Sequence, residues 1–388
     1  MSMIAVVPVR AGQGNVQGMG SSILLGTFKS SAITKPPAKR GDYGKPPMIS
    51  VRNVVLMGLC SAVDVCVPVD VNFKPNNPIS RFGEGDEPPR TCQESVELCC
   101  KVPKDPPKEK PQPDASNLRG CGYSNAWGLG TTVVGGNGNE AQFGEFPWVV
   151  ALLDSNSTYI GVGVLIHPQV VMTAAHYASK YTPGTIKIRA GEWDTQTVKE
   201  MYDHQEREVQ EIFVHKEFKP KSLKNDISLL RLQSPLKLAD HINMLCLPNQ
   251  DESFDDYKNC VANGWGKDYF GQEGHYAVIL KKVEQNMVPH ERCQKLLQRT
   301  RLGSHFRLHS SFVCAGGEEG RDTCQGDGGA PLACPFDNDR YKLSGLVAWG
   351  IGCGQKDVPA VYASVAAFRQ WVDGKMNQWG YGTATYTV

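Results

Sequence analysis

An all-β fold is predicted for residues 121–388. Short apolar runs such as WVVALL, VVMTAA and LSGLVAW are separated by Gly, Asn, Asp and Pro turns, the pattern of a β-barrel or β-sandwich. Two stretches, 289–297 and 365–376, have a helical pattern instead. We therefore expect a β-rich domain with one internal helix and a short helix near its C-terminus.

Composition argues against several classes of partner and cofactor. The 388 residues contain 41 Lys and Arg against 40 Asp and Glu, without a basic block, so neither nucleic acid nor a membrane surface is expected as the main partner. The 13 cysteines lack the paired spacing of a zinc cluster and favour the disulfide framework of a secreted protein. Their odd number leaves at least one unpaired, removed or intermolecular. No metal or other cofactor is expected.

The first 62 residues are predicted to precede the folded modules. Residues 1–47 are rich in Gly, Ser, Pro and Lys and are interpreted as an unstructured leader or a mistaken start. The following apolar run, VVLMGLCSAV, is too short to cross a bilayer. With Arg52 before it and small residues near its end, segment 48–62 is predicted to be a signal peptide. A buried strand remains the alternative for this run.

A small cysteine-rich module and a linker come next. Residues 63–100 carry several closely spaced cysteines. Residues 101–120 are dominated by Pro and charged side chains, which predicts a semi-rigid, solvated linker. The β-rich domain begins at Cys121.

Three motifs in 121–388 point to one kind of chemistry. VMTAAHYA contains His176, NDISLLRL contains Asp226, and RDTCQGDGGAPLAC contains Gly328. Together with VVGG, EFPWVV, NGWG and AWGIGCG, in this order, they resemble the chymotrypsin-like serine proteases. The resemblance implies a double β-barrel with a short C-terminal helix. It also implies that His176 is in the place of the general base and Asp226 in that of the acid orienting it.

The family's serine nucleophile is replaced by Gly328. Glycine has no hydroxyl, so an acyl-enzyme cannot form at this position. The resemblance leaves an oxyanion-hole remnant at the N–H groups of Gly326 and residue 328. A protease that loses this serine loses roughly 10⁶-fold in turnover, so we expect residues 121–388 to be an inactive protease-like domain.

The resemblance also identifies the remains of a specificity pocket. Asp322 takes the place of the acid that binds Arg or Lys in trypsin-like enzymes, and Gly350 belongs to the pocket wall. Ala348 and Ala360 replace a serine and a small glycine, which predicts a narrowed pocket. Asp322 is therefore either a vestigial ligand or a structural acid. Activation by a trypsin-like cut before Val133 is expected to be lost as well, because Val133 directly follows GLGTT, which contains no Lys or Arg.

The resemblance implies four disulfides in the β domain. They are Cys121–Cys246, Cys260–Cys334, Cys293–Cys314 and Cys324–Cys353. The bridge that usually flanks the histidine would need cysteines near Gly161 and Tyr177. Both ends are missing together, so no orphan thiol results.

The small module resembles a clip domain, the disulfide knot that precedes arthropod serine proteases of the haemolymph. CVPVDVN and TCQESVELCC carry this likeness, which implies Cys66–Cys92 and possibly Cys60–Cys99, with Cys100 unpaired. One expected cysteine is missing, so an error in the predicted coding sequence is an alternative. Between the two motifs, Arg81 is the candidate cleavage site in a polar, Pro- and Gly-rich stretch.

The whole arrangement resembles a clip-domain serine protease homologue related to the prophenoloxidase-activating factors. This implies a secreted haemolymph protein that assists prophenoloxidase activation in melanisation and innate immunity. Prophenoloxidase and the activating clip-domain proteases are the implied partners, and self-association is a further option. The alternatives are a decoy, a recognition protein of microbial surfaces, and a protease of unconventional activity.

Two lesser sites complete the sequence predictions. Asn156 begins the single Asn-X-Ser/Thr sequon and is a candidate for glycosylation. Glu192 and Asp194 lie near a loop that binds calcium in some relatives. Two acids are too few for a calcium ion, so a solvated turn is expected there.

Overall fold

The computed structural model describes residues 65–68, 97–100, 110–113, 118–130, 138–268, 270–271 and 273–388. The chain divides into two compact units, Met1–Glu109 and Lys110–Val388. This boundary falls within the predicted linker 101–120. The predicted leader and signal peptide, the candidate cleavage site Arg81 and the activation position Val133 lie outside the described residues.

Two short strands are described in the first unit. β1 Val65–Pro68 pairs antiparallel with β2 Glu97–Cys100, and the register places Cys66 opposite Cys99. Cys60 and Cys92, which the predicted bridges require, lie outside the described ranges.

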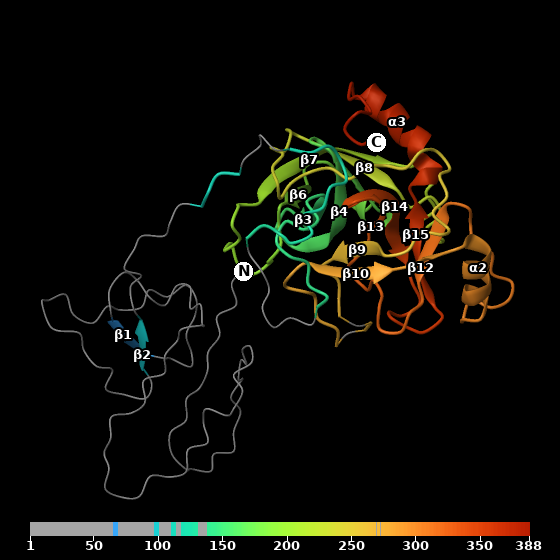
Figure 1. The fold of residues 1–388 in the computed structure, drawn as a ribbon, viewed down its shortest axis with the longest axis horizontal. Helices are drawn as coiled ribbons and strands as arrows, with labels where there is room; N and C mark the ends of the chain where they lie inside the picture. The colour runs from blue at the N-terminus through green and yellow to red at the C-terminus, as the bar shows by residue number, and fades with distance from the viewer. Residues whose placement is uncertain are drawn as a thin grey trace, which may run out of the picture. The chain divides into compact units, whose positions relative to one another are not determined.

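Six strands of the second unit close into an antiparallel barrel with the spatial order β3-β4-β5-β8-β7-β6 (Figure 1). Their bounds are β3 Val149–Asp154, β4 Tyr159–His167, β5 Val170–Thr173, β6 Ile186–Ala190, β7 Gln205–Val214 and β8 Ser228–Leu232. In β6 buried and half-buried residues alternate, as expected for a strand with one face on the barrel interior. The predicted run VVMTAA is strand only to Thr173, and a helical turn then begins.

Seven strands form the second antiparallel sheet, in the order β10-β9-β13-β14-β15-β12-β11. Their bounds are β9 Cys260–Gly264, β10 Lys281–Gln285, β11 Met287–Val288, β12 Phe312–Gly316, β13 Pro331–Asp337, β14 Arg340–Trp349 and β15 Pro359–Ser364. The predicted all-β fold with two barrel-type sheets is confirmed.

The helices are few and short. α1 Ala175–Ala178 follows β5, α2 His290–Gln298 projects beside β12, and α3 Arg369–Gln378 follows the single turn η2 Ala366–Phe368. Both helical predictions are confirmed, with α3 reaching two residues further than expected. Two contacts hold α3 on the first barrel. Lys375 of α3 forms an ion pair with Glu211 of β7 at 2.8 Å, and Trp371 of α3 stacks on Phe213 of β7. No helix within the described ranges is long and apolar enough to span a membrane.

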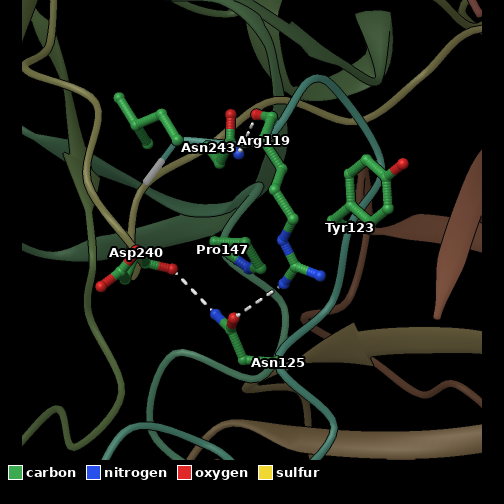
Figure 2. Close-up of a pocket in the computed structure, with 7 residues that line it drawn as sticks. Arg119, Tyr123, Asn125, Pro147, Asp240 and Asn243 are labelled. Atoms are coloured by element: carbon green, nitrogen blue, oxygen red, sulfur yellow. Dashed lines mark hydrogen bonds between the residues drawn. The ribbon is translucent and has the colours of Figure 1, made fainter. Parts of the chain in front are cut away.

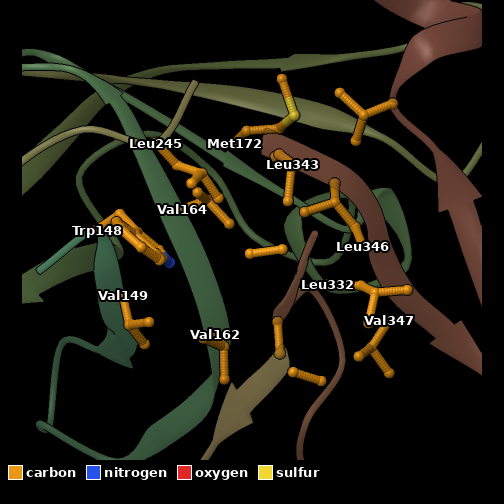
Figure 3. Close-up of a cluster of buried hydrophobic side chains, with 14 of the residues drawn as sticks. Trp148, Val149, Val162, Val164, Met172, Leu245, Leu332, Leu343, Leu346 and Val347 are labelled. Atoms are coloured by element: carbon orange, nitrogen blue, oxygen red, sulfur yellow. The ribbon is translucent and has the colours of Figure 1, made fainter. Parts of the chain in front are cut away.

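One continuous apolar core joins the two sheets. Figure 3 shows Trp148, Val162 and Val164 of the first barrel beside Leu332 and Leu346 of the second. Complete burial of these side chains makes the junction rigid. The segments that carry His176, Asp226 and Gly328 all end or begin at this junction, so the fold determines their mutual geometry.

Candidate functional site: the former catalytic centre

His176 and Asp226 form a complete base–acid pair. Asp226 lies two residues before β8 and is fully buried, and its Oδ2 lies 2.6 Å from Nδ1 of His176. Its other oxygen accepts the backbone N–H of His176 at 2.7 Å. These two contacts fix the position of α1 and aim the second ring nitrogen at the neighbouring loop. This is the orientation that a general base requires.

Gly328, which the family resemblance predicts to replace the nucleophile, lies opposite this histidine. It is buried just before β13, and its carbonyl accepts the N–H of Val162 at 3.1 Å. A β-carbon built on Gly328 would lie 2.8 Å from Nε2 of His176, but it would overlap Cε2 of the Tyr177 ring. The Gly328 backbone thus faces the histidine, while the space that a side chain would need is filled.

Tyr177 fills this space from beside the histidine. Its ring centroid lies 4.3 Å from that of His176. A β-carbon on Gly161 would lie 3.0 Å from the same ring, at Cδ2 and Cε2. The resemblance placed the missing bridge near positions 161 and 177, and the Tyr177 ring fills the space beside both Gly161 and Gly328. Burial raises the pKa of the Tyr177 phenol to about 12, which keeps the ring neutral at physiological pH.

Two aromatic side chains lie beside Gly326 of the predicted oxyanion-hole remnant. Both Gly326 and Gly328 are buried. Gly326 has φ of +103°, and a β-carbon there would lie 2.5 Å from the Tyr276 ring. Its carbonyl accepts the hydroxyl of Tyr159 at 2.9 Å. Aromatic rings therefore pack against Gly326, on the side where a β-carbon would lie and at its carbonyl.

Asp322 is held by donors from within the protein. Its carboxylate accepts the backbone N–H groups of Thr323 at 2.8 Å and Gly354 at 2.9 Å, and the side-chain amide of Gln285 at 3.2 Å. Burial raises its pKa to about 6. This bonding is that of a structural acid at the base of the former pocket.

The walls of this pocket are unequal. Ala348 and Ala360 are buried, whereas Gly350 is exposed. By the family resemblance, Ala348 stands where a serine is expected and Ala360 where a glycine is expected. The buried side therefore lacks the hydroxyl and the open space that a bound arginine would use.

Asp327 is buried without a cation. Its two oxygens accept the N–H groups of Gly266 at 2.7 Å and Cys324 at 2.9 Å. Among the described residues no ammonium or guanidinium contacts this carboxylate. Desolvation raises its pKa to about 6 in spite of the two donors. An active protease would use this acid to bind a new N-terminal ammonium.

Comparison with known proteins identifies the family. A family model described as Trypsin matches residues 136–372. Phenoloxidase-activating factor 2 of Galleria mellonella is 48% identical over 301 residues, which cover 74% of this chain and 99% of that protein. The chain belongs to the clip-domain serine protease homologues, within the trypsin family.

Two further relatives of this homologue carry informative names. Inactive CLIP domain-containing serine protease A8 of Anopheles gambiae is 42% identical over 76% of this chain and 80% of that protein. Inactive CLIP domain-containing serine protease A28 of the same organism is 36% identical over 73% of this chain and 77% of that protein. The predicted resemblance is confirmed.

Four disulfides hold the homologue's β domain. The bonded pairs are Cys121–Cys246, Cys260–Cys334, Cys293–Cys314 and Cys324–Cys353. They are the pairs that the resemblance implied. The last one links the loop before Gly328 to the former pocket wall, which limits how far this loop can move.

A small hollow lies where Cys121 joins the first barrel of this homologue. Figure 2 shows Arg119, Asn125 and Asn243 around it. Asn243 donates to the carbonyl of Arg119 at 3.1 Å, and Asn125 donates to that of Asp240 at 2.8 Å. It has room for about one water molecule, so it is interpreted as the docking point of the segment that precedes Cys121.

The lesser predicted sites lie apart from the former catalytic centre. Asn156 is in the exposed turn between β3 and β4, where an enzyme that adds a glycan could reach it. Glu192 is buried and pairs with Arg189 at 2.8 Å, and Asp194 accepts the hydroxyl of Thr197 at 2.7 Å. Both acids thus have partners within the protein.

Sequence reasoning missed the role of Tyr177, although positions 161 and 177 stood out as a missing bridge. No sequence pattern joined Tyr177 to Gly161 and Gly328, because the three residues meet only in the folded protein. Gln285, which binds Asp322, had no signal either, because it lies on β10, far away in the sequence.

Proposed function

We propose that this homologue is a secreted, non-catalytic regulator of a proteolytic cascade, acting as a cofactor in the activation of prophenoloxidase. The single observation that carries the non-catalytic part is the filled nucleophile position. Gly328 supplies no hydroxyl, and the Tyr177 ring occupies the space that one would need. His176 has no residue to deprotonate.

The regulatory part is supported by what the homologue retains. Its fold, four disulfides and His176–Asp226 pair remain in place without the nucleophile. A protease-like surface that cannot cleave is suited to binding other proteins. The name of the Galleria relative, Phenoloxidase-activating factor 2, links such a protein to prophenoloxidase activation, and the Anopheles names contain the word inactive.

Secretion and a proteolytic switch complete the proposal. Multiple disulfides fit an oxidising extracellular compartment such as haemolymph. The switch is a cut after Arg81 by an upstream clip-domain protease, since Arg81 lies in a polar segment rich in Pro and Gly. Such a cut would loosen the small module and free it to bind prophenoloxidase or a second copy.

An activation assay tests this function. Purified protein is added to prophenoloxidase and its activating protease, and phenoloxidase activity is followed. Wild type should raise the activity, Arg81→Gln should not, and the control Arg90→Gln should behave like wild type. A fall in activity with wild type would instead identify a decoy. Peptide hydrolysis by the purified protein alone would contradict the non-catalytic assignment.

A further inference from the structure

Two segments of the β domain concentrate positive charge. Residues 215–224 and 290–310 together hold nine Lys and Arg against two acidic residues. The rest of the chain has 32 Lys and Arg against 38 Asp and Glu. The two segments are separated by 65 residues and form no continuous basic run. Their net charge is positive (nine minus two), whereas that of the rest of the chain is negative (32 minus 38).

The fold brings the two segments together. The N–H of Asn225, next to the first segment, donates to Ser311 Oγ, next to the second, at 3.1 Å. Leu223 packs with Leu302 and Phe306 on the apolar cluster beneath α2. Burial and the positive charge of Lys224 both lower the pKa of His309.

The basic side chains of this region are available to a partner. Arg292 and Lys295 of α2, and Arg299 directly after it, recur at spacings of three and four and are exposed. Cys293 and Leu297 of the same helix face the core. Together with the neighbouring loops they form what we call the basic surface: Lys219, Lys221, Lys224, Arg292, Lys295, Arg299, Arg301 and Arg307. Within the described part of the chain, none of the eight has a carboxylate within ion-pair distance.

Apolar side chains lie beside these charges. Leu302, Phe306 and Ile351 are half-buried and belong to one cluster with Trp349. The rings of Phe306 and Trp349 meet edge to face at 6.0 Å. Ala348 belongs to the same apolar cluster, so the basic surface adjoins this wall of the predicted former pocket. In Figure 1, α2 stands at the outer side of the second sheet.

We propose that the basic surface binds an acidic face of a partner protein that also presents aromatic or aliphatic side chains. Arginine forks pair with carboxylates in two-pronged contacts, and Leu302, Phe306 and Ile351 provide the apolar centre that protein interfaces combine with a charged rim. A sulfated polysaccharide would match the charges but leave this apolar centre unused. The proposal rests on the proposed regulatory function and specifies the surface that serves it.

The test uses purified full-length protein and synthetic polyanions, without any cascade component. Binding of a random Glu–Tyr copolymer, poly-glutamate and heparin is measured by calorimetry at physiological and at high salt. The copolymer should bind more tightly than both other polymers, and its affinity should fall as salt rises. Because prophenoloxidase is absent, a negative activation assay and a negative binding assay remain distinguishable.

Matched variants locate the site. Arg299→Glu combined with Arg301→Glu and Arg307→Glu should weaken copolymer binding by about tenfold or more. The control reverses three exposed lysines elsewhere, Lys199, Lys237 and Lys258, to Glu and should bind nearly as wild type does. Unfolding midpoints of all variants check that they remain folded.

The apolar centre separates a protein partner from a polysaccharide. Leu302→Ser and Ile351→Ser, made separately in case one destabilises the domain, should each weaken copolymer binding and leave heparin binding unchanged. Heparin binding as tight as that of the copolymer, unaffected by both serine variants, would overturn the proposal in favour of a polysaccharide site. Equal losses in the two charge-reversal triples would show that the basic surface is only a solvated face.

Discussion

The two halves of the former catalytic centre differ in how much of the protease arrangement they keep. The first barrel carries His176 and Asp226, which are joined by two hydrogen bonds. The second supplies Gly328 without a side chain and Asp322 with all its bonds satisfied internally. The retained pair, His176 and Asp226, is hydrogen-bonded within the first barrel. Gly328 and Asp322, in the part that differs from an active protease, stand where a protease would contact its substrate. The residues that stabilise the fold are thus different from the residues that catalysis would require, although they lie close together.

The acids of the two halves sharpen this contrast. Asp226 accepts from a histidine side chain as well as from a backbone N–H. Asp327 is also buried but has only backbone donors. The first acid connects two segments of its barrel, while the second remains buried without the cation that an active protease provides.

The largest expected effect is that of Asp226→Ala. Removal of this carboxylate leaves the His176 ring and its backbone N–H without their acceptor, and at about 1 to 3 kcal/mol for each unsatisfied donor the loss is about 2 to 6 kcal/mol. Urea unfolding measures the change. Asp255→Ala, at an exposed position, is the control and should lie close to wild type. If Asp226→Ala and Asp255→Ala unfold at the same urea concentration, the His176–Asp226 pair does not stabilise the fold. The contrast between the two halves of the centre is then wrong.

The next effect is a pH dependence that comes from Asp327. Its folded pKa of about 6 lies above the ordinary value of 3.8, so between these values the folded protein holds a proton that the unfolded chain has released. The free energy of unfolding therefore falls as pH rises from about 4 to about 6, by roughly 3 kcal/mol from this group. In Asp327→Asn this part of the slope should vanish.

Unfolding curves at several pH values compare the slopes of wild type and Asp327→Asn. The slopes are compared rather than the absolute stabilities, because the amide cannot accept from both Gly266 and Cys324 and so has a cost of its own. If the free energy of unfolding depends on pH in the same way in wild type and in Asp327→Asn, the Asp327 carboxylate has a cationic partner in solution.

A smaller effect is expected from filling the nucleophile position. Gly328→Ala places a methyl group against the Tyr177 ring, and overpacking of this kind costs about 1 to 3 kcal/mol. Tyr177→Ala should remove most of this cost, so the double variant should be more stable than the sum of the single changes predicts. Strict additivity in this double-mutant cycle would show that the ring does not occupy the site.

The sequence predicted the fold well because local pattern and family motifs agreed. WVVALL and LSGLVAW lie in or next to β3 and β14, and the two helical stretches correspond to α2 and to η2 with α3. The motifs also indicated which residues occupy the three triad positions. VVMTAA was only partly strand, because the chain turns after Thr173 to present His176 to Asp226.

What the sequence could not predict depends on contacts between distant segments. The direction of the Tyr177 ring follows from the small size of Gly161 and Gly328, which lie 16 residues before and 151 after it. Asp322 could be read as a ligand or as a structural acid until Gln285 and Gly354 were seen to hold it. The basic surface likewise exists only after two separate segments have packed together.

Labelling with a serine-directed phosphonate tests the central claim, that the nucleophile position is closed, most directly. Wild type and Gly328→Ser are incubated with a tagged phosphonate beside active trypsin as the positive control, and labelling and cleavage after Arg are quantified. Neither form should be labelled or cleave, because Gly328 has no hydroxyl and a serine introduced there meets the Tyr177 ring. Stoichiometric labelling of the wild-type domain, or robust cleavage after Arg by Gly328→Ser, would contradict the account.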